Sequence, residues 1–149
     1  MTEFDQSTLD SISERYAHGD CVPFSMAIHQ RFGWPLVEVF ARVEGDLGVP
    51  LHASCKMPDG KIFDAYGISD ERTVINRYCH FASRGKKLII RDALPDDVLS
   101  WGGLIDDECL ESEIEEADDH LSLLLHLKDL SFDCTNEYLD RIQSSSLKP

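Results

Sequence analysis

The sequence predicts an α+β fold in which about four antiparallel strands form a sheet. A helix that begins at Cys21 packs on this sheet, and a long acidic helix flanks it near the C-terminus. Apolar residues recur with a helical period up to residue 32, and short β-branched segments separated by turn signals follow. Helical spacing then returns after residue 107, and this order of elements is typical of α+β proteins. The length of 149 residues fits one domain that spans residues 1–149.

Two helices are expected in the first quarter of the chain. The first covers residues 7–17, with Ser7 as a suitable N-cap. The second covers residues 21–32 and carries Pro23 in its first turn, where the missing N–H costs nothing. Gly33 follows directly and is the residue that most often ends a helix.

The remaining elements follow from changes of hydrophobic period and from turn residues. A helix is expected over about 70–82, a long one over 107–127 and a short one near 135–142. Residues 94–105 are expected to be irregular or to hold a short helical turn. The expected strands cover residues 36–43, 51–57, 61–66 and 87–91.

Composition limits the class of protein. The formal net charge is −14, which opposes direct binding to nucleic acids and to anionic membranes. It favours a basic protein partner or a basic peptide substrate, although high charge also serves solubility. Five irregularly spaced cysteines do not form a disulfide framework, and the N-terminus carries no secretory signal pattern. We therefore expect a cytoplasmic protein with reduced thiols.

Cys21 is the first candidate for a chemical role. It stands at the expected N-terminus of a helix, where the macrodipole and unpaired N–H groups favour a thiolate, the nucleophilic form of cysteine. The neighbouring carboxylate of Asp20 opposes this effect unless it points elsewhere. A buried structural cysteine is the alternative interpretation.

The register of one hairpin decides whether His52 and Asp64 can meet. A three-residue Pro58-Asp59-Gly60 loop has glycine in the left-handed position. It pairs Met57 with Lys61, so the numbers of paired residues on the two strands sum to 118. His52 and Asp64 then share one face of the sheet as diagonal neighbours. A two-residue turn would instead place them on opposite faces.

Cys21, His52 and Asp64 together would supply what thiol chemistry requires. His52 would exchange a proton with Cys21 and with the leaving group, and Asp64 would orient the imidazole. The backbone N–H of Cys21 would stabilise an oxyanion together with a second donor, for which His18 is the nearest candidate.

Three segments resemble the Cys, His and Asp motifs of the papain-like superfamily. The similarity is greatest to transglutaminase-like small bacterial and phage proteins, and the segments also resemble cysteine peptidases of the NlpC type. The resemblance implies a cysteine hydrolase or acyl-transferase, such as a protease, deamidase or amidase, with catalytic Cys21, His52 and Asp64 and no cofactor. It covers about residues 15–68, and the segments that carry it are 19–27, 52–55 and 59–67.

Two alternatives remain open to the sequence. A zinc site from His52, Cys55, Cys79 and His80 is disfavoured because strand alternation points Cys55 away from His52, so no metal is expected. Residues 106–119 hold nine acidic residues and no basic one, which allows a non-enzymatic interaction protein or inhibitor on the same scaffold, encoded by a phage or mobile element. The apolar residues of this segment are expected to form the core face of the helix.

Overall fold

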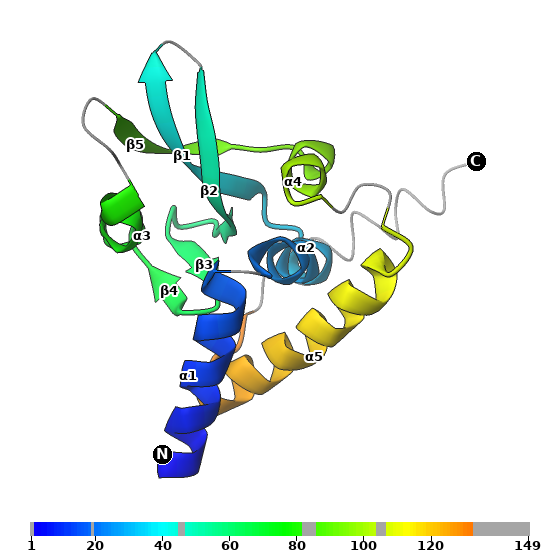
Figure 1. Cartoon of the computed structure of the whole chain (residues 1–149). Helices are drawn as coiled ribbons and strands as arrows, with labels where there is room; N and C mark the ends of the chain where they lie inside the picture. The colour runs from blue at the N-terminus through cyan, green and yellow to red at the C-terminus, as the bar shows by residue number, and fades with distance from the viewer. Residues whose placement is uncertain (1, 19, 45–46, 82–85, 104–106, 133–149) are drawn as a thin grey trace.

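The computed structural model describes residues 2–18, 20–44, 47–81, 86–103 and 107–132. Within these ranges the chain forms five α-helices and an antiparallel sheet of five strands (Figure 1). The predicted α+β class is confirmed, and the sheet has one strand more than expected. The expected helix near 135–142 lies outside the described residues.

The helices fall close to the predicted ranges. They are α1 (Glu3–His18), α2 (Cys21–Phe32), α3 (Glu71–Tyr78), α4 (Pro95–Trp101) and α5 (Leu110–Leu127), and a single 3₁₀ turn, η1 (Cys79–Phe81), follows α3. The strands are β1 (Leu36–Glu44), β2 (Leu47–Lys56), β3 (Ile62–Asp64), β4 (Gly67–Ser69) and β5 (Lys87–Asp92). They lie in the order β4-β3-β2-β1-β5.

Local hydrogen bonds explain where the prediction missed a boundary. Helix α1 starts at Glu3 rather than near Ser7 because Thr2 and Asp5 cap it reciprocally, each backbone N–H donating to the other side chain. The additional strand β4 arises because the chain turns back directly after Asp64, whose Oδ1 accepts the N–H of Tyr66 at 2.9 Å. Three-residue strands carry too short a pattern to be predicted from periodicity.

The hairpin between β2 and β3 has the three-residue loop that the sequence predicts. The N–H of Met57 donates to the carbonyl of Lys61 at 2.7 Å, and Gly60 has a φ of 88°. Cys55 pairs with Phe63, so the paired numbers sum to 118 as expected. The loop therefore fixes the register that brings the His52 strand and the Asp64 strand together.

The left-handed conformation of Gly60 gives a first testable prediction. Gly60→Ala should lower the free energy of unfolding by about 1 kcal/mol, because a Cβ in the left-handed region is strained even where space is open. Gly60→Asn should cost less, since asparagine tolerates this region. Urea denaturation measures both, and equal losses for Ala and Asn would contradict the assignment of strain to the backbone.

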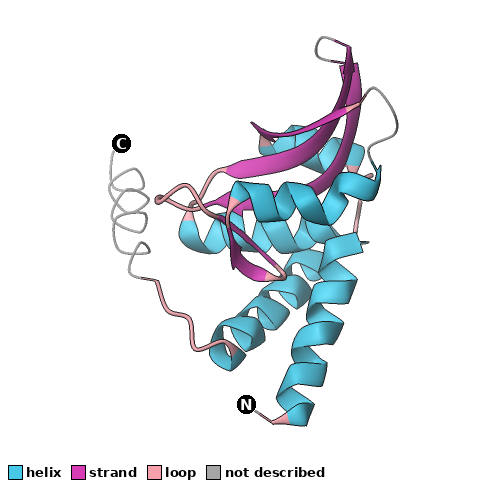
Figure 2. Ribbon diagram, turned by 90° about the vertical axis from the view of Figure 1, so that its left-hand side faces the viewer, coloured by secondary structure: helices cyan, strands magenta, loops and turns pink. Residues whose placement is uncertain are grey.

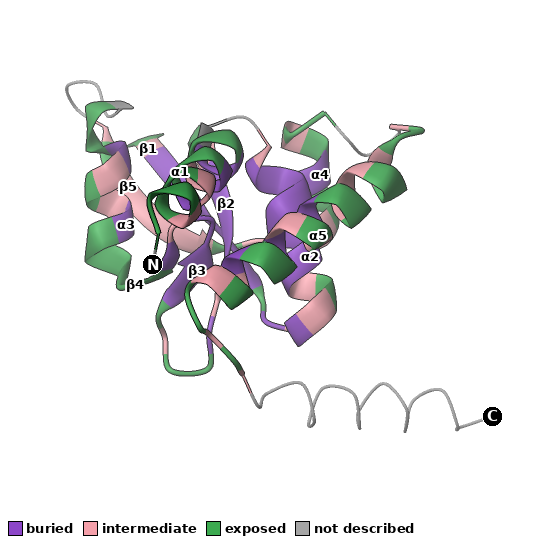
Figure 3. Cartoon of the chain, turned by 90° about the horizontal axis from the view of Figure 1, so that it is seen from below, coloured by how far each residue is buried: buried purple, intermediate pink, exposed green. Residues whose placement is uncertain are grey.

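The sheet separates two apolar clusters. Helices α2, α4 and α5 cover one face, on which Leu36, Cys55 and Phe63 lie. Helix α3 covers the other face, where Val74 and Tyr78 pack against Val37, Val39 and Ile62. Figure 3, seen from below, shows α3 on one side of the buried strands and α2 with α5 on the other. The β1–β2 hairpin extends past the helices (Figure 1).

Helix α5 buries its apolar side as predicted and turns its acidic side partly toward the protein itself. Ala117, Leu121 and Leu124 are buried in the core. Glu116 and Asp118 form ion pairs with arginines of α1 and α2, and α1 and α5 lie next to each other (Figure 2). Over the described ranges, the helices are too short or too polar for any of them to traverse a bilayer.

Candidate active site

Helix α2 places Cys21 at its first turn with little opposing charge. The residue is buried, with an exposed fraction of 7%, and the first turn of the helix contains no acidic residue. Asp20 precedes the helix but makes no capping hydrogen bond with its side chain. Its carboxylate instead lies 3.1 Å from Nε of Arg15 on α1. The carboxylate that could repel a thiolate is thus held by an arginine.

The neighbouring strands bring His52 and Asp64 into direct contact. Nε2 of His52 lies 3.1 Å from Oδ2 of Asp64, and both residues are almost completely buried. The second carboxylate oxygen accepts the N–H of Tyr66. Both oxygens of Asp64 are therefore engaged, which fixes the carboxylate and, through it, one edge of the imidazole.

The environment of His52 favours its charged form. Burial by itself lowers the pKa of His52, but the hydrogen bond with Asp64 and the proximity of Cys21, together with the charges of these two groups, raise it to about 9. Since Nε2 faces Asp64, Nδ1 is the nitrogen available to Cys21. Nδ1 has no hydrogen-bond partner of ordinary geometry among the described residues, so the thiol–imidazole contact is longer or more bent than an ideal hydrogen bond.

An aromatic side chain that the sequence did not single out covers the imidazole. The ring of Tyr78 stacks on the ring of His52 with a centroid distance of 4.8 Å and an interplanar angle of 21°. Sequence periodicity places Tyr78 only on the apolar side of its helix, and no local signal distinguishes it from Val74. The stacking becomes visible only when α3 lies on the sheet.

The other cysteines lie apart from this cluster or outside the described residues. Cys55 points to the opposite face of the sheet, as strand alternation predicts, and its thiol lies 3.4 Å from the carbonyl oxygen of Ser25. Burial raises the pKa of the Cys55 thiol, which therefore stays protonated. Cys79 and Cys109 are exposed, whereas Cys134 and the side chain of His18 are not described.

Metal binding has no geometric support in the part of the chain that the structure describes. Within those residues no three side chains of His, Cys, Asp or Glu converge in a way that could hold an ion. His52 and Cys55, two members of the zinc site that the sequence disfavours, lie on opposite faces of the sheet.

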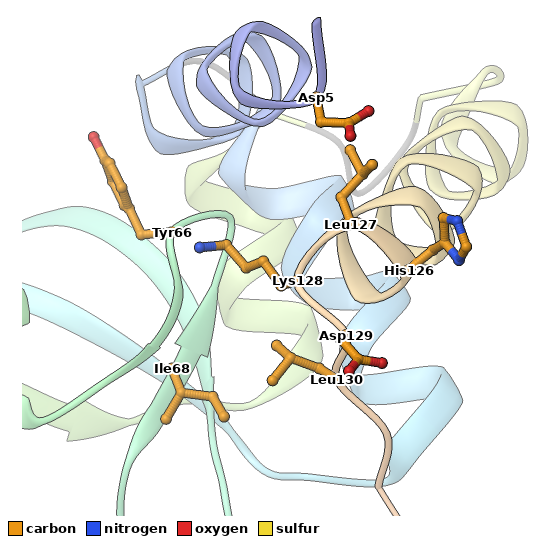
Figure 4. A pocket seen from close by; sticks show the side chains of 8 residues that line it. All are labelled: Asp5, Tyr66, Ile68, His126, Leu127, Lys128, Asp129 and Leu130. Carbon is orange, nitrogen blue, oxygen red and sulfur yellow. The ribbon is translucent and has the colours of Figure 1, made fainter. Parts of the chain in front are cut away.

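A groove lies beside the hairpin that carries Asp64. It has a volume of about 740 Å³ and runs between the start of α1, the β3–β4 turn and the end of α5 (Figure 4). The aliphatic chain of Lys128 lies against the turn at Gly67. Neither Cys21 nor His52 lines this groove, so it is separate from the candidate site. Its lining residues are Asp5, Tyr66, Ile68 and residues 126–130.

Comparisons with known proteins identify no relative of this chain. The chain matches no protein-family model, no curated protein and no solved structure. What the fold and the site define is an α+β protein with a buried histidine–carboxylate pair beside a cysteine at a helix N-terminus.

Proposed function

We propose that the chain is a small cysteine hydrolase or acyl-transferase of the papain-like, transglutaminase-like kind, in which Cys21 is the nucleophile. The observation that carries the proposal is the buried His52–Asp64 hydrogen bond, with Cys21 as the second group acting on the imidazole. Buried titratable groups whose pKa is shifted by a specific charged partner are typical of catalytic sites.

The residues divide the chemistry among them. An imidazolium at His52 stabilises the negative charge of a thiolate at Cys21. The sulfur attacks the carbonyl carbon of an amide or thioester, and the oxyanion is met by N–H groups at the start of α2. When the bond to the leaving group breaks, Nδ1 of His52 gives its proton to that group. Water or an amine then attacks the acyl-enzyme, losing a proton to His52, and the thiolate leaves.

The described surface supports a peptide or protein as the substrate or partner. Two acidic residues of α5 are neutralised by Arg15 and Arg31, whereas Glu115 and Asp119 are exposed. Such a surface suits a basic segment of another protein. The chemistry needs no cofactor, and the reduced thiol of Cys21 that it requires fits the reducing cytoplasm.

The near-complete burial of His52 and Asp64 favours one alternative, a non-enzymatic interaction protein on the same scaffold. In that case the cluster would serve packing, and the exposed acidic side chains of α5 would carry the function. The two functions differ in what they require of the thiol at residue 21, and thiol reactivity therefore separates them.

The test is the rate at which iodoacetamide alkylates each thiol of the folded protein. At pH 7, Cys21 should react at least about 10-fold faster than the exposed Cys79 and Cys109, because only a thiolate is nucleophilic. Cys55 is the control for a buried thiol without an imidazole, with an exposed fraction of 0% against 7% for Cys21, and it should not react. Peptide mapping by mass spectrometry over time measures the individual rates.

His52→Gln serves as the second control and should reduce the rate at Cys21 to that of an ordinary thiol. If Cys21 in the unaltered protein reacts no faster than Cys79, the proposal is wrong and the interaction protein is favoured.

A further inference from the structure

Tyr78 connects the two halves of the candidate site. Its ring lies almost parallel to the imidazole of His52, and its hydroxyl donates a hydrogen bond to the carbonyl of Ala17 at 3.1 Å. Ala17 is near the end of α1, four residues before Cys21. One side chain therefore contacts the histidine strand with its ring and the segment leading to the cysteine with its hydroxyl.

The anchoring of this ring is strong. Tyr78 is the last residue of α3 and has an exposed fraction of 2%. It belongs to the cluster in which α3 packs on β1 and β3, together with Val39, Ile62 and Val74. Burial raises the pKa of Tyr78 above its ordinary range, and the charges of Asp64 and Cys21 act in the same direction. The hydroxyl therefore remains protonated and able to donate at neutral pH.

The imidazole needs a constraint that Asp64 does not provide. A single hydrogen bond at Nε2 fixes one atom of the ring but permits rotation about the axis through that atom. A stacked ring restricts this rotation, because it fixes the plane of the imidazole. With the plane and one nitrogen fixed, Nδ1 can point in only one direction.

We infer that Tyr78 is a positioning residue, whose ring fixes the plane of His52 so that Nδ1 is directed at Cys21. This inference rests on the proposed function and adds a residue that acts through the histidine. The ring has the positioning role, and the hydroxyl secures the ring to the end of α1.

The experiment compares Tyr78→Phe with Tyr78→Leu, after circular dichroism has shown that each variant folds. Phenylalanine keeps the ring, so Cys21 should be alkylated within about 2-fold of the original rate, with the same pH profile. Leucine removes the ring, and alkylation at pH 7 should slow about 10-fold or more, because small errors of orientation have large kinetic effects. Tyr78→Met replaces the leucine variant if the latter does not fold.

Proton NMR provides a readout that does not depend on catalysis. The ring C–H resonances of His52, assigned by their loss in His52→Gln, should be shifted upfield in the original protein and in Tyr78→Phe, and should lose this shift in Tyr78→Leu. If the proposed function fails, Cys21 is unreactive in the original protein, yet the upfield shift still reports on the stack.

Three results would overturn the inference. One is an unchanged alkylation rate in a folded Tyr78→Leu variant. Another is faster alkylation in that variant, which would make the ring only a cover. The third is a fall in the alkylation rate of Cys21 in Tyr78→Phe as large as that in Tyr78→Leu, which would assign the effect to the hydroxyl.

Discussion

Replacement of Asp64 by alanine should lower the free energy of unfolding by about 3–5 kcal/mol, as is typical when one partner of a buried ion pair is removed. His52 is completely buried, and Asp64 is the group that its Nε2 contacts. Without the carboxylate, the desolvated imidazole must lose its proton or remain unpaired, and the N–H of Tyr66 loses its acceptor as well. Urea denaturation at pH 7 measures the loss.

Two further variants separate the charge of Asp64 from its shape. Asp64→Asn keeps the size of the side chain and one of its oxygens, so it should lower the free energy of unfolding by less than Asp64→Ala does. Asp119→Ala, at an exposed carboxylate of α5, should change stability by no more than about 0.5 kcal/mol. If Asp64→Ala costs no more than Asp119→Ala, the His52–Asp64 pair does not stabilise the fold.

The stability of the protein should fall between about pH 6.5 and pH 9 because of His52. The pKa of His52 rises from 6.5 in the unfolded chain to about 9 in the folded protein, so the folded state binds more protons in this interval. The stabilisation is complete below about pH 6.5 and is lost as pH rises through 9. A shift of this size corresponds to about 3 kcal/mol. Denaturation at half-unit pH steps measures the slope.

His52→Gln isolates this contribution from those of other groups. The raised pKa of the Cys55 thiol lowers stability only above about pH 9, where the unfolded chain loses that proton. When both curves are measured in a Cys21→Ser background, so that the thiol facing the imidazole does not titrate, the difference made by His52→Gln between pH 6 and 8.5 belongs to the histidine. A difference in the free energy of unfolding that stays constant, or that grows with pH, would contradict the raised pKa of His52.

The sequence determined the local structure well, because short-range physics controls it. Helix α2 has the predicted bounds from Cys21 to Phe32, since Pro23 and Gly33 act through their own backbone conformations. The Pro58-Asp59-Gly60 loop likewise predicted the register of β2 and β3 from three residues. That register was enough to predict that His52 and Asp64 lie on one face within reach of each other.

Only the tertiary structure decided what surrounds these residues. The stacking of Tyr78 on His52 depends on how α3 lies across the sheet, 26 positions further along the chain. Arg15 forms ion pairs with Asp20 and with Glu116, and both pairs depend on how α1 meets α2 and α5. Contacts between distant elements follow from packing of the whole chain, and periodicity carries no information about which charged or aromatic side chain meets which partner.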